Sequence, residues 1–378
     1  MLDELLSDEG WAYASTPPVE PGDPGRFHAL FGRDSLITAL QVLPERPDVA
    51  RATLRALAAR QGSRDDPETD EEPGKILHEY RPHAEPRFAE LGWPVRDGQL
   101  LYYGSADSTS WFLVVLAALG DDALSAELEP ARRAAAGWLE RALERGDGLV
   151  RYGPRTSSGG LAQQGWRDAS APETHANAGG ILREDGSAPA APQADADVQA
   201  VAYAALRALG DEERAAALAA RIERDFGPEV MALEAGDVPV PGAGSQLGWL
   251  LWSGALGEER AGEVAARLCE PDVLTPFGLR TLARTSPVFD PQAYHRGSIW
   301  PFDSWLGWGG LRAAGFHGEA ERVRSGVLAA LDRLGQAPEL YAVDAEGELQ
   351  PAPSANRVQA WTVGARWALE HGWDGRPV

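Results

Sequence analysis

The chain has 378 residues, 44% of them hydrophobic and 24% charged, as is usual for a soluble globular protein with a large core. Its formal net charge of −22 disfavours nucleic acid and anionic membranes as partners, because phosphate binding needs a basic face. With one cysteine, Cys269, no apolar run long enough to span a membrane and an acidic start at Met1–Glu4, we expect a cytoplasmic protein without disulfides.

Along the chain, apolar stretches of helical length alternate with amphipathic, charged stretches. The apolar stretches predict helices buried on all sides, and the amphipathic stretches predict helices with one exposed face. The predicted buried helices cover residues 36–43, 105–119, 195–209, 245–256, 299–314 and 357–370. The predicted amphipathic helices cover residues 49–60, 131–145, 213–224, 258–269 and 319–334, and a short helix at 2–6 is expected to pack against the last buried one.

This alternation predicts an all-α fold, an (α/α)6 barrel with apolar helices inside and amphipathic helices outside. We expect one domain over residues 1–378, with two unrelated helical bundles as the alternative. The turns after the buried helices are short, whereas the connections before them are long. Because long loops in a compact domain usually serve function, we expect them to open together at the N-termini of the buried helices.

These long connections hold most of the dense clusters of Trp, Arg, His and carboxylate residues. Aromatic rings stack on the C–H faces of sugars while charged groups bind their hydroxyls, so this composition indicates a neutral carbohydrate ligand. A zinc site is not expected, because His78, Glu79 and His83 lack the His-Glu-x-x-His spacing. We predict no metal and no cofactor.

Hydrolysis of a glycosidic bond needs one protonated and one ionised carboxyl group. Asp168, close to Trp166 in the longest loop, is the candidate acid, and Glu339, between two apolar neighbours, is the candidate base. A loop carboxylate can also be a solvated charge or a helix cap.

The solvated interpretation is preferred for the run Asp65–Glu72. For Asp34 and Asp107, a helix cap and a ligand contact remain equally open. Arg33 has a structural alternative too, since it can simply pair with Asp107 or Glu79. Trp305, inside a predicted buried helix, is expected in the core.

Eight segments, taken together and in order, resemble the catalytic domain of bacterial amylo-α-1,6-glucosidases. These glycogen-debranching proteins are related to glucoamylases and other six-hairpin glycosidases. The segments, which run from about Phe31 to Ala365, are FGRDSLITALQVLP, DPETDEEPGKILHEYR, YYGSADST, QQGWRDAS, FGLRTLA, YHRGSIWPFDSW, PELYAV and QAWTVGA.

The resemblance implies an inverting hydrolase that acts on α-glucosides from the non-reducing end. It places the general acid at Asp168 and the general base at Glu339, in agreement with the choice made from residue chemistry. Arg33 and Asp34 resemble the pair that holds glucose hydroxyls in the first subsite. The other predicted substrate-binding residues are Glu79, Arg81, Tyr103, Asp107, Trp166, Arg167, His295, Trp300 and Gln359.

The sequence departs from the family pattern in ways that bear on the substrate. Members usually carry a β-rich N-terminal domain, and this chain has almost nothing before Arg26. Asp197 replaces the usual Glu of the third buried helix, and Ser245-Gln246 replaces Ser-Asn in the fourth. The main expectation is an exo-acting α-1,6-glucosidase of oligosaccharides. The alternatives are a hydrolase of a small α-glycoside such as glucosylglycerate, mannosylglycerate or trehalose, and a non-catalytic sugar-binding protein on the same scaffold.

Overall fold

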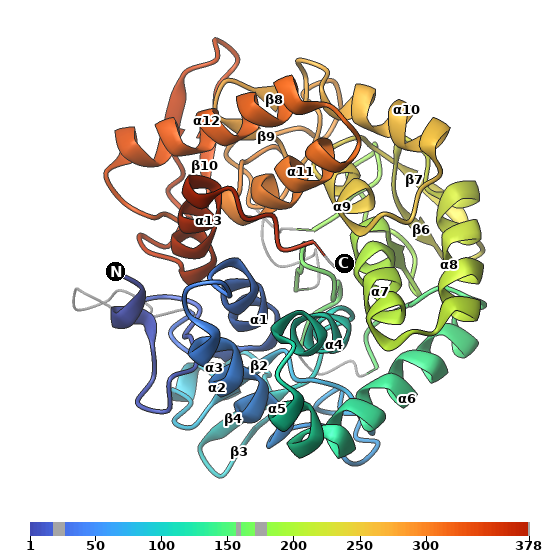
Figure 1. Cartoon of the computed structure of the whole chain (residues 1–378), viewed down its shortest axis with the longest axis vertical. Coiled ribbons are helices and arrows are strands. Elements are labelled where there is room, and N and C mark those ends of the chain that lie inside the picture. Colours follow the sequence, from blue (N-terminus) through green and yellow to red (C-terminus); the bar gives the residue numbers. More distant parts are fainter. Residues whose placement is uncertain (18–26, 156–159, 171–179, 377–378) are drawn as a thin grey trace.

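In the computed structural model, which describes residues 1–17, 27–155, 160–170 and 180–376, six helices form a closed inner ring (Figure 1). Following the chain, each inner helix packs on the next, and the last packs on the first. These helices are α1 (Gly32–Gln41), α4 (Ser108–Leu119), α7 (Ala196–Leu209), α9 (Gln246–Ser253), α11 (Pro301–Ala313) and α13 (Ala360–His371). The predicted (α/α)6 fold is confirmed.

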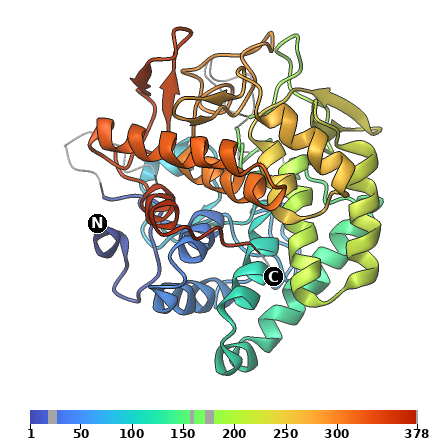
Figure 2. The same cartoon turned by 45° about the horizontal axis from the view of Figure 1, so that its top comes forward.

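Outer helices surround this ring (Figures 1 and 2). They are α2 (Pro47–Ala58), α6 (Glu129–Arg145), α8 (Glu212–Asp225), α10 (Glu258–Leu268) and α12 (His317–Leu334). In α8, for example, Ala215, Leu218 and Ile222 are buried at helical spacing while the charged residues face water. The sixth outer position holds only a short 3₁₀ helix, η1 (Leu2–Leu5), which packs on α13.

The turns that follow the inner helices are short. Gly120 ends α4 and Gly210 ends α7 in the left-handed conformation, with φ of 61° and 71°, which lets the chain reverse at once. The turn after α4 leads into a short helix that the sequence did not predict, α5 (Asp122–Glu127). Among the described residues, no helix has the length and apolar character needed to cross a membrane.

The long connections contain short antiparallel strands that the sequence analysis did not predict. Figure 2 shows one hairpin, β10–β11, projecting from the edge of the ring. Strand β1 runs directly into α1 and β5 directly into α7, so these strands deliver the chain to the N-termini of inner helices. One sheet has the order β1 (Leu30–Phe31), β2 (Glu79–Arg81), β4 (Gln99–Tyr102), β3 (Val95–Arg96), and a short helix, α3 (Pro86–Glu90), lies between β2 and β3 in sequence.

A second sheet has the order β5 (Ala194–Asp195), β6 (Val230–Glu234), β7 (Val238–Pro241), and the remaining strands form two hairpins. These hairpins are β8 (Leu274–Thr275) with β9 (Gly278–Leu279), and β10 (Tyr341–Val343) with β11 (Leu349–Pro351).

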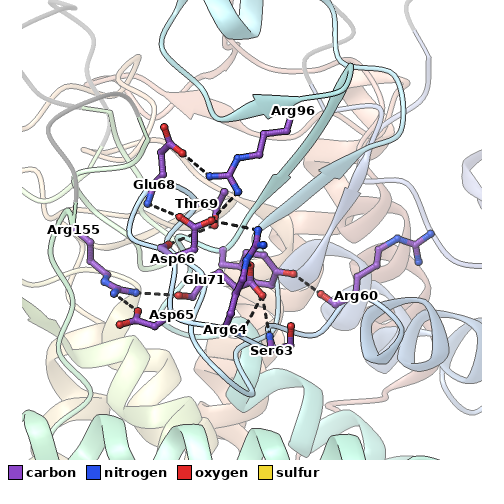
Figure 3. A network of polar contacts seen from close by, with 11 residues as sticks. Arg60, Ser63, Arg64, Asp65, Asp66, Glu68, Thr69, Glu71, Arg96 and Arg155 are labelled. Carbon is purple, nitrogen blue, oxygen red and sulfur yellow. Dashed lines mark hydrogen bonds and ion pairs between the residues drawn. The ribbon is translucent and has the colours of Figure 1, made fainter.

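The acidic run Asp65–Glu72 differs from the expected solvated segment. Its members Asp70 and Glu71 are only 2% and 6% exposed. Three arginines from separate segments converge on the run (Figure 3), and Arg64, Arg96 and Arg155 pair with Glu71, Asp66 and Asp65 respectively. Most of these carboxylates therefore fix the loop between α2 and β2 in place, and only part of the run is a solvated surface.

The last described residues, which end at Arg376, cross the ring at the end that carries the short turns (Figure 1). The indole nitrogen of Trp373 donates to the backbone oxygen of Leu40 in α1 at 2.8 Å. Trp305 of α11 donates to the Trp373 oxygen at 2.7 Å, and Trp252 of α9 donates to the Asp374 oxygen at 2.9 Å. Trp305 is fully buried, as expected.

Candidate active site

The N-terminal ends of the inner helices form a buried polar layer at the end of the ring with the long connections. Six polar side chains, one from the start of each inner helix, are at most 6% exposed. They are Asp34 (α1), Asp107 (the N-cap of α4), Asp197 (α7), Gln246 (α9), Asp303 (α11) and Gln359 (the N-cap of α13). Buried polar groups of this density need partners, and arginines supply them for two of the six, Asp107 and Asp197.

Arg33, only 2% exposed, ties the loop that carries Asp168 to the start of α4. Its Nε donates to both carboxylate oxygens of Asp107 at 2.8 and 3.0 Å. Its Nη1 donates to Asp168 at 3.1 Å, and its Nη2 donates to the backbone oxygen of Gly165 at 2.9 Å. The alternative pairing of Arg33 with Asp107 is thus confirmed, and it coexists with a contact to the candidate acid.

Asp168 is more accessible than its neighbours in this layer. Its side chain is 27% exposed, against 1% for Asp107. The surrounding protein buries the carboxyl group enough to raise its pKa to about 6, while the positive charge of Arg33 acts in the opposite direction. A protonated fraction therefore persists close to neutral pH, as a general acid requires.

Glu339 lies just before β10 and is held by two hydrogen-bond donors. The hydroxyl of Tyr294 donates to Oε1, and the backbone N–H of Asn356 donates to Oε2 at 3.2 Å. Hydrogen bonds of this kind stabilise and orient an ionised carboxylate. Tyr294 and Asn356 were not singled out in the sequence, because nothing in their local pattern indicates that they contact Glu339.

Asp34 lies close to both candidate catalytic groups. Its carboxylate accepts a hydrogen bond from Gln359 at 3.3 Å, and Gln359 in turn accepts one from Asn356, next to Glu339, at 3.0 Å. Burial, together with the negative charges of Asp168 and Glu339, raises the pKa of Asp34 to about 8 against the influence of Arg33. The consecutive residues Arg33 and Asp34 therefore connect to both carboxyl groups, since Arg33 binds Asp168 and Asp34 is linked through Gln359 and Asn356 to Glu339.

The predicted aromatic residues lie packed beneath the loop. Trp166 is 2% exposed and stacks on Trp249 with 6.1 Å between ring centres, and Trp300 meets its ring edge-on at 5.5 Å. His295 stacks on Trp300 at 5.2 Å, and burial together with nearby arginines lowers its pKa well below the ordinary value. In this structure, Trp166, Trp300 and a neutral His295 therefore pack against one another and support the site as a buried aromatic cluster.

Arg167 extends in the other direction from its neighbour Asp168. Its guanidinium lies 4.4 Å from the ring centre of Trp166, pairs with Asp197 and donates to Ser245 at 2.8 Å. Asp197, one of the positions at which the sequence departs from the family pattern, thus binds Arg167 together with Ser245, the neighbour of the other such position, Gln246. Arg167 anchors one side of the loop and Arg33 the other.

Two further predicted residues join the site, and one does not. Glu79 and Arg81 form a buried ion pair in β2. Burial raises the pKa of Glu79 and the charge of Asp168 adds to the rise, so Glu79 lies within range of Asp168. Tyr103 faces elsewhere, because its hydroxyl donates to the backbone oxygen of Arg60 beyond the end of α2 at 2.7 Å. In the described part of the chain, no cluster of three His, Cys, Asp or Glu residues could hold a metal ion.

The buried carboxyl groups predict an unusual dependence of stability on pH. Burial raises the pKa of Asp34 to about 8 and those of Asp168 and Asp303 to about 6, all above the value of about 4 expected in the unfolded chain. The folded state therefore binds more protons, so this stabilisation is full below pH 4 and is lost as the pH rises through 6 and 8. We expect Tm to fall by about 3–6 °C between pH 5 and pH 8.

Thermal unfolding at constant ionic strength measures this effect. Asp34→Asn, which removes the group with the highest of these pKa values, is expected to flatten the profile between pH 6 and pH 8. A Tm that rises over this range in the unmodified protein would contradict the prediction.

Comparison with known proteins decides the family. A model of the mannosylglycerate hydrolase MGH1-like glycoside hydrolase domain matches residues 107–342, more than half of the chain. The chain belongs to this family. The matched region contains Asp168 and Glu339. The family match places the protein among the glycoside hydrolases. No curated protein sequence matches the chain.

Solved structures show the same fold at low sequence identity. GH63 mannosylglycerate hydrolase from Thermus thermophilus in complex with Tris is 18% identical over 98% of both chains, with a TM-score of 0.69. The complex with glucose is 17% identical over 99% of this chain and 97% of that chain, with a TM-score of 0.67. Neutral trehalase Nth1 from Saccharomyces cerevisiae is 15% identical over 96% of this chain and 77% of that chain, with a TM-score of 0.62.

These matches confirm part of the resemblance found in the sequence. The relationship to six-hairpin glycosidases holds. The specific assignment to the amylo-α-1,6-glucosidases is not supported, because the family model and the solved structures point to mannosylglycerate hydrolase and trehalase.

Proposed function

We propose that the protein hydrolyses a small α-glycoside with inversion of configuration, with Asp168 as general acid and Glu339 as general base. The observation that carries the proposal is the pair Arg33-Asp34, because Arg33 binds Asp168 and Asp34 is linked through Gln359 and Asn356 to Glu339. Two carboxyl groups from distant segments thereby act at one end of the ring.

The environments of the two carboxyl groups support different roles. Asp168 has a raised pKa of about 6 and the more exposed side chain, which suits a group that gives a proton to the leaving oxygen. Glu339 accepts hydrogen bonds from Tyr294 and from the Asn356 backbone, which suits an ionised group that activates water. An inverting enzyme needs about 6.5–9.5 Å between such carboxyl groups to admit the water.

Two substrate classes compete. The family model and the Thermus thermophilus structure carry the name of mannosylglycerate hydrolase, and the yeast structure is described as a trehalase, so the matches favour a short glycoside. The eight sequence segments favour an α-1,6-glucosidase of the debranching type instead. We place the short glycoside first, because the family match rests on more than half of the chain.

A product analysis tests the proposal. The protein is incubated with glucosylglycerate, mannosylglycerate, trehalose, panose and a branched dextrin, and NMR follows the anomeric configuration of the released sugar. We expect turnover of a short glycoside with the β-anomer as first product. A higher kcat/KM on panose would favour the debranching function, and a first product with retained configuration would overturn the inverting mechanism. Binding without any turnover would support the non-catalytic alternative.

The pKa of Asp168 predicts the basic side of the pH profile. The acid must be protonated in the free enzyme, so kcat/KM is expected to fall above about pH 6 and to approach a tenfold loss per pH unit. Initial rates between pH 5 and pH 9 measure this limb, with thermal unfolding at each pH as the control for stability. A profile that stays flat up to pH 8 would show that Asp168 is not the titrating acid.

A further inference from the structure

A cavity of about 500 Å³ lies beside α6, and neither Asp168 nor Glu339 lines it. It opens between that helix, the connection before β2 and the segment that follows α6. Five of its described lining residues carry a positive charge and two carry a negative charge. The cations are Lys75, Arg141, Arg145, Arg151 and Arg155, and the carboxylates are Asp65 and Glu72. The chain as a whole has a net charge of −22, so the lining of this cavity is opposite in sign to the rest of the protein.

The cations of this basic cavity differ in how far they are neutralised. Arg145 bonds Glu72 at 2.7 Å. Arg155 pairs with Asp65 on the acidic run, as Figure 3 shows, and Arg151 pairs with a carboxylate outside the cavity lining. These three arginines are therefore committed to carboxylates, and they leave little capacity for a ligand.

Lys75 and Arg141 are less committed. The Lys75 side chain is 4% exposed, and its ammonium donates to the backbone oxygen of Asp70 at 3.2 Å and lies 3.7 Å from Glu72, beyond hydrogen-bond distance. The Arg141 guanidinium donates to the backbone oxygen of Pro73 at 2.6 Å and, among the described residues, pairs with no carboxylate. A compact ammonium and a planar guanidinium at one cavity supply the donors that a phosphate group binds.

We propose that the basic cavity binds the phosphate group of a small metabolite. The charge excess attracts an anion, and the volume exceeds what a single phosphate fills, so a phosphorylated sugar also fits. Trp138, which is 3% exposed, also lines the cavity, and the Lys75 ammonium lies 5.9 Å from its ring centre. This inference does not rest on the proposed hydrolysis.

The wall of the basic cavity is continuous with the support of the catalytic loop. Gln164 and Ala106 line the cavity, and the Gln164 backbone oxygen accepts hydrogen bonds from the Ala106 N–H at 2.8 Å and from Arg33 at 3.5 Å. Arg33 also holds Asp168. A ligand in the basic cavity therefore lies against Gln164, whose backbone oxygen binds Arg33, and Arg33 in turn holds the candidate acid Asp168.

Calorimetric titration at constant ionic strength tests the proposal, with inorganic phosphate, glucose 6-phosphate and glucose as probes. We expect millimolar binding of at least one phosphate-bearing probe and none of glucose at this site. Arg141→Gln, a change at an exposed position of α6 that should leave folding intact, is expected to weaken that binding about tenfold. Arg133→Gln is the matched control, because Arg133 lies on the same helix, is 75% exposed and pairs with Glu129.

The comparison of glucose 6-phosphate with inorganic phosphate identifies the source of the phosphate group. Tighter binding of glucose 6-phosphate indicates a sugar phosphate, and tighter binding of inorganic phosphate indicates the free ion. Asp168→Asn should leave either affinity unchanged, which separates the basic cavity from the catalytic groups. Equal affinities in Arg141→Gln and Arg133→Gln, or no binding of either phosphate probe, would overturn the proposal.

Discussion

Asp168→Asn and Glu339→Gln are each expected to lower kcat on the natural glycoside by a factor of about 10²–10⁴. Asparagine keeps the shape of Asp168 and its contact with Arg33 but has no proton to give at the pH of the reaction. Glutamine keeps the position of Glu339 between Tyr294 and Asn356 but cannot take a proton from water. Initial rates on the substrate identified in the product analysis measure both losses.

A substrate with an activated leaving group separates the two roles. Departure of fluoride from a glycosyl fluoride needs little protonation, so Asp168→Asn should recover much of its activity on that substrate, whereas Glu339→Gln should not. Circular dichroism and thermal unfolding check that both variants fold. Equal rescue of both variants, or a loss below tenfold in either, would remove the assignment of these residues as acid and base.

Arg33→Met is expected to reduce the free energy of unfolding by about 3–5 kcal/mol and to abolish most activity. The change leaves the buried carboxylate of Asp107 without its two hydrogen bonds from Nε and releases Asp168 and the Gly165 backbone. Asp168 also loses the positive charge that opposes the rise of its pKa, so any remaining activity should extend to higher pH. Denaturant unfolding and the pH profile measure the two effects.

Arg33→Lys distinguishes the charge of Arg33 from its geometry. A lysine keeps the positive charge, but its single ammonium cannot reach Asp107, Asp168 and the Gly165 oxygen together. We therefore expect Arg33→Lys to recover part of the stability and little of the activity. Activity close to that of the unmodified protein would show that the forked contacts of Arg33 are dispensable.

The inner ring was predictable because the apolar composition of its helices is visible in the sequence. The stretch Trp111–Leu116 contains only apolar residues, so the helix that contains it is expected to be covered on every side there. The polar residue at the start of each inner helix follows from the same reasoning, since Asp34, Asp107 and their counterparts interrupt the apolar pattern where the long connections end. The sequence analysis accordingly expected the long loops to open at the starts of these helices, but it left Asp34 and Asp107 open between a helix cap and a ligand contact.

The strands and the finer contacts of the site were not predictable. A strand of two or three residues, such as Ala194–Asp195, is too short to show an alternating pattern, and its partner lies far along the chain. Tyr103 illustrates the limit for side chains, because the sequence places it near Asp107 while the backbone at the end of β4 turns its hydroxyl toward Arg60. The contact between Tyr294 and Glu339 joins two separate connections and leaves no local signal.

The crossing made by Trp373 and its neighbours has a consequence for how the molecule is assembled. The hydrogen bond from Trp373 to Leu40 joins positions separated by 333 residues. Trp305 of α11 and Trp252 of α9 donate hydrogen bonds to the same C-terminal segment. Such distant contacts are the slowest to form, because the whole intervening polypeptide must first be arranged. This end of the ring is therefore expected to close last, after α13 and the segment that follows it have been synthesised.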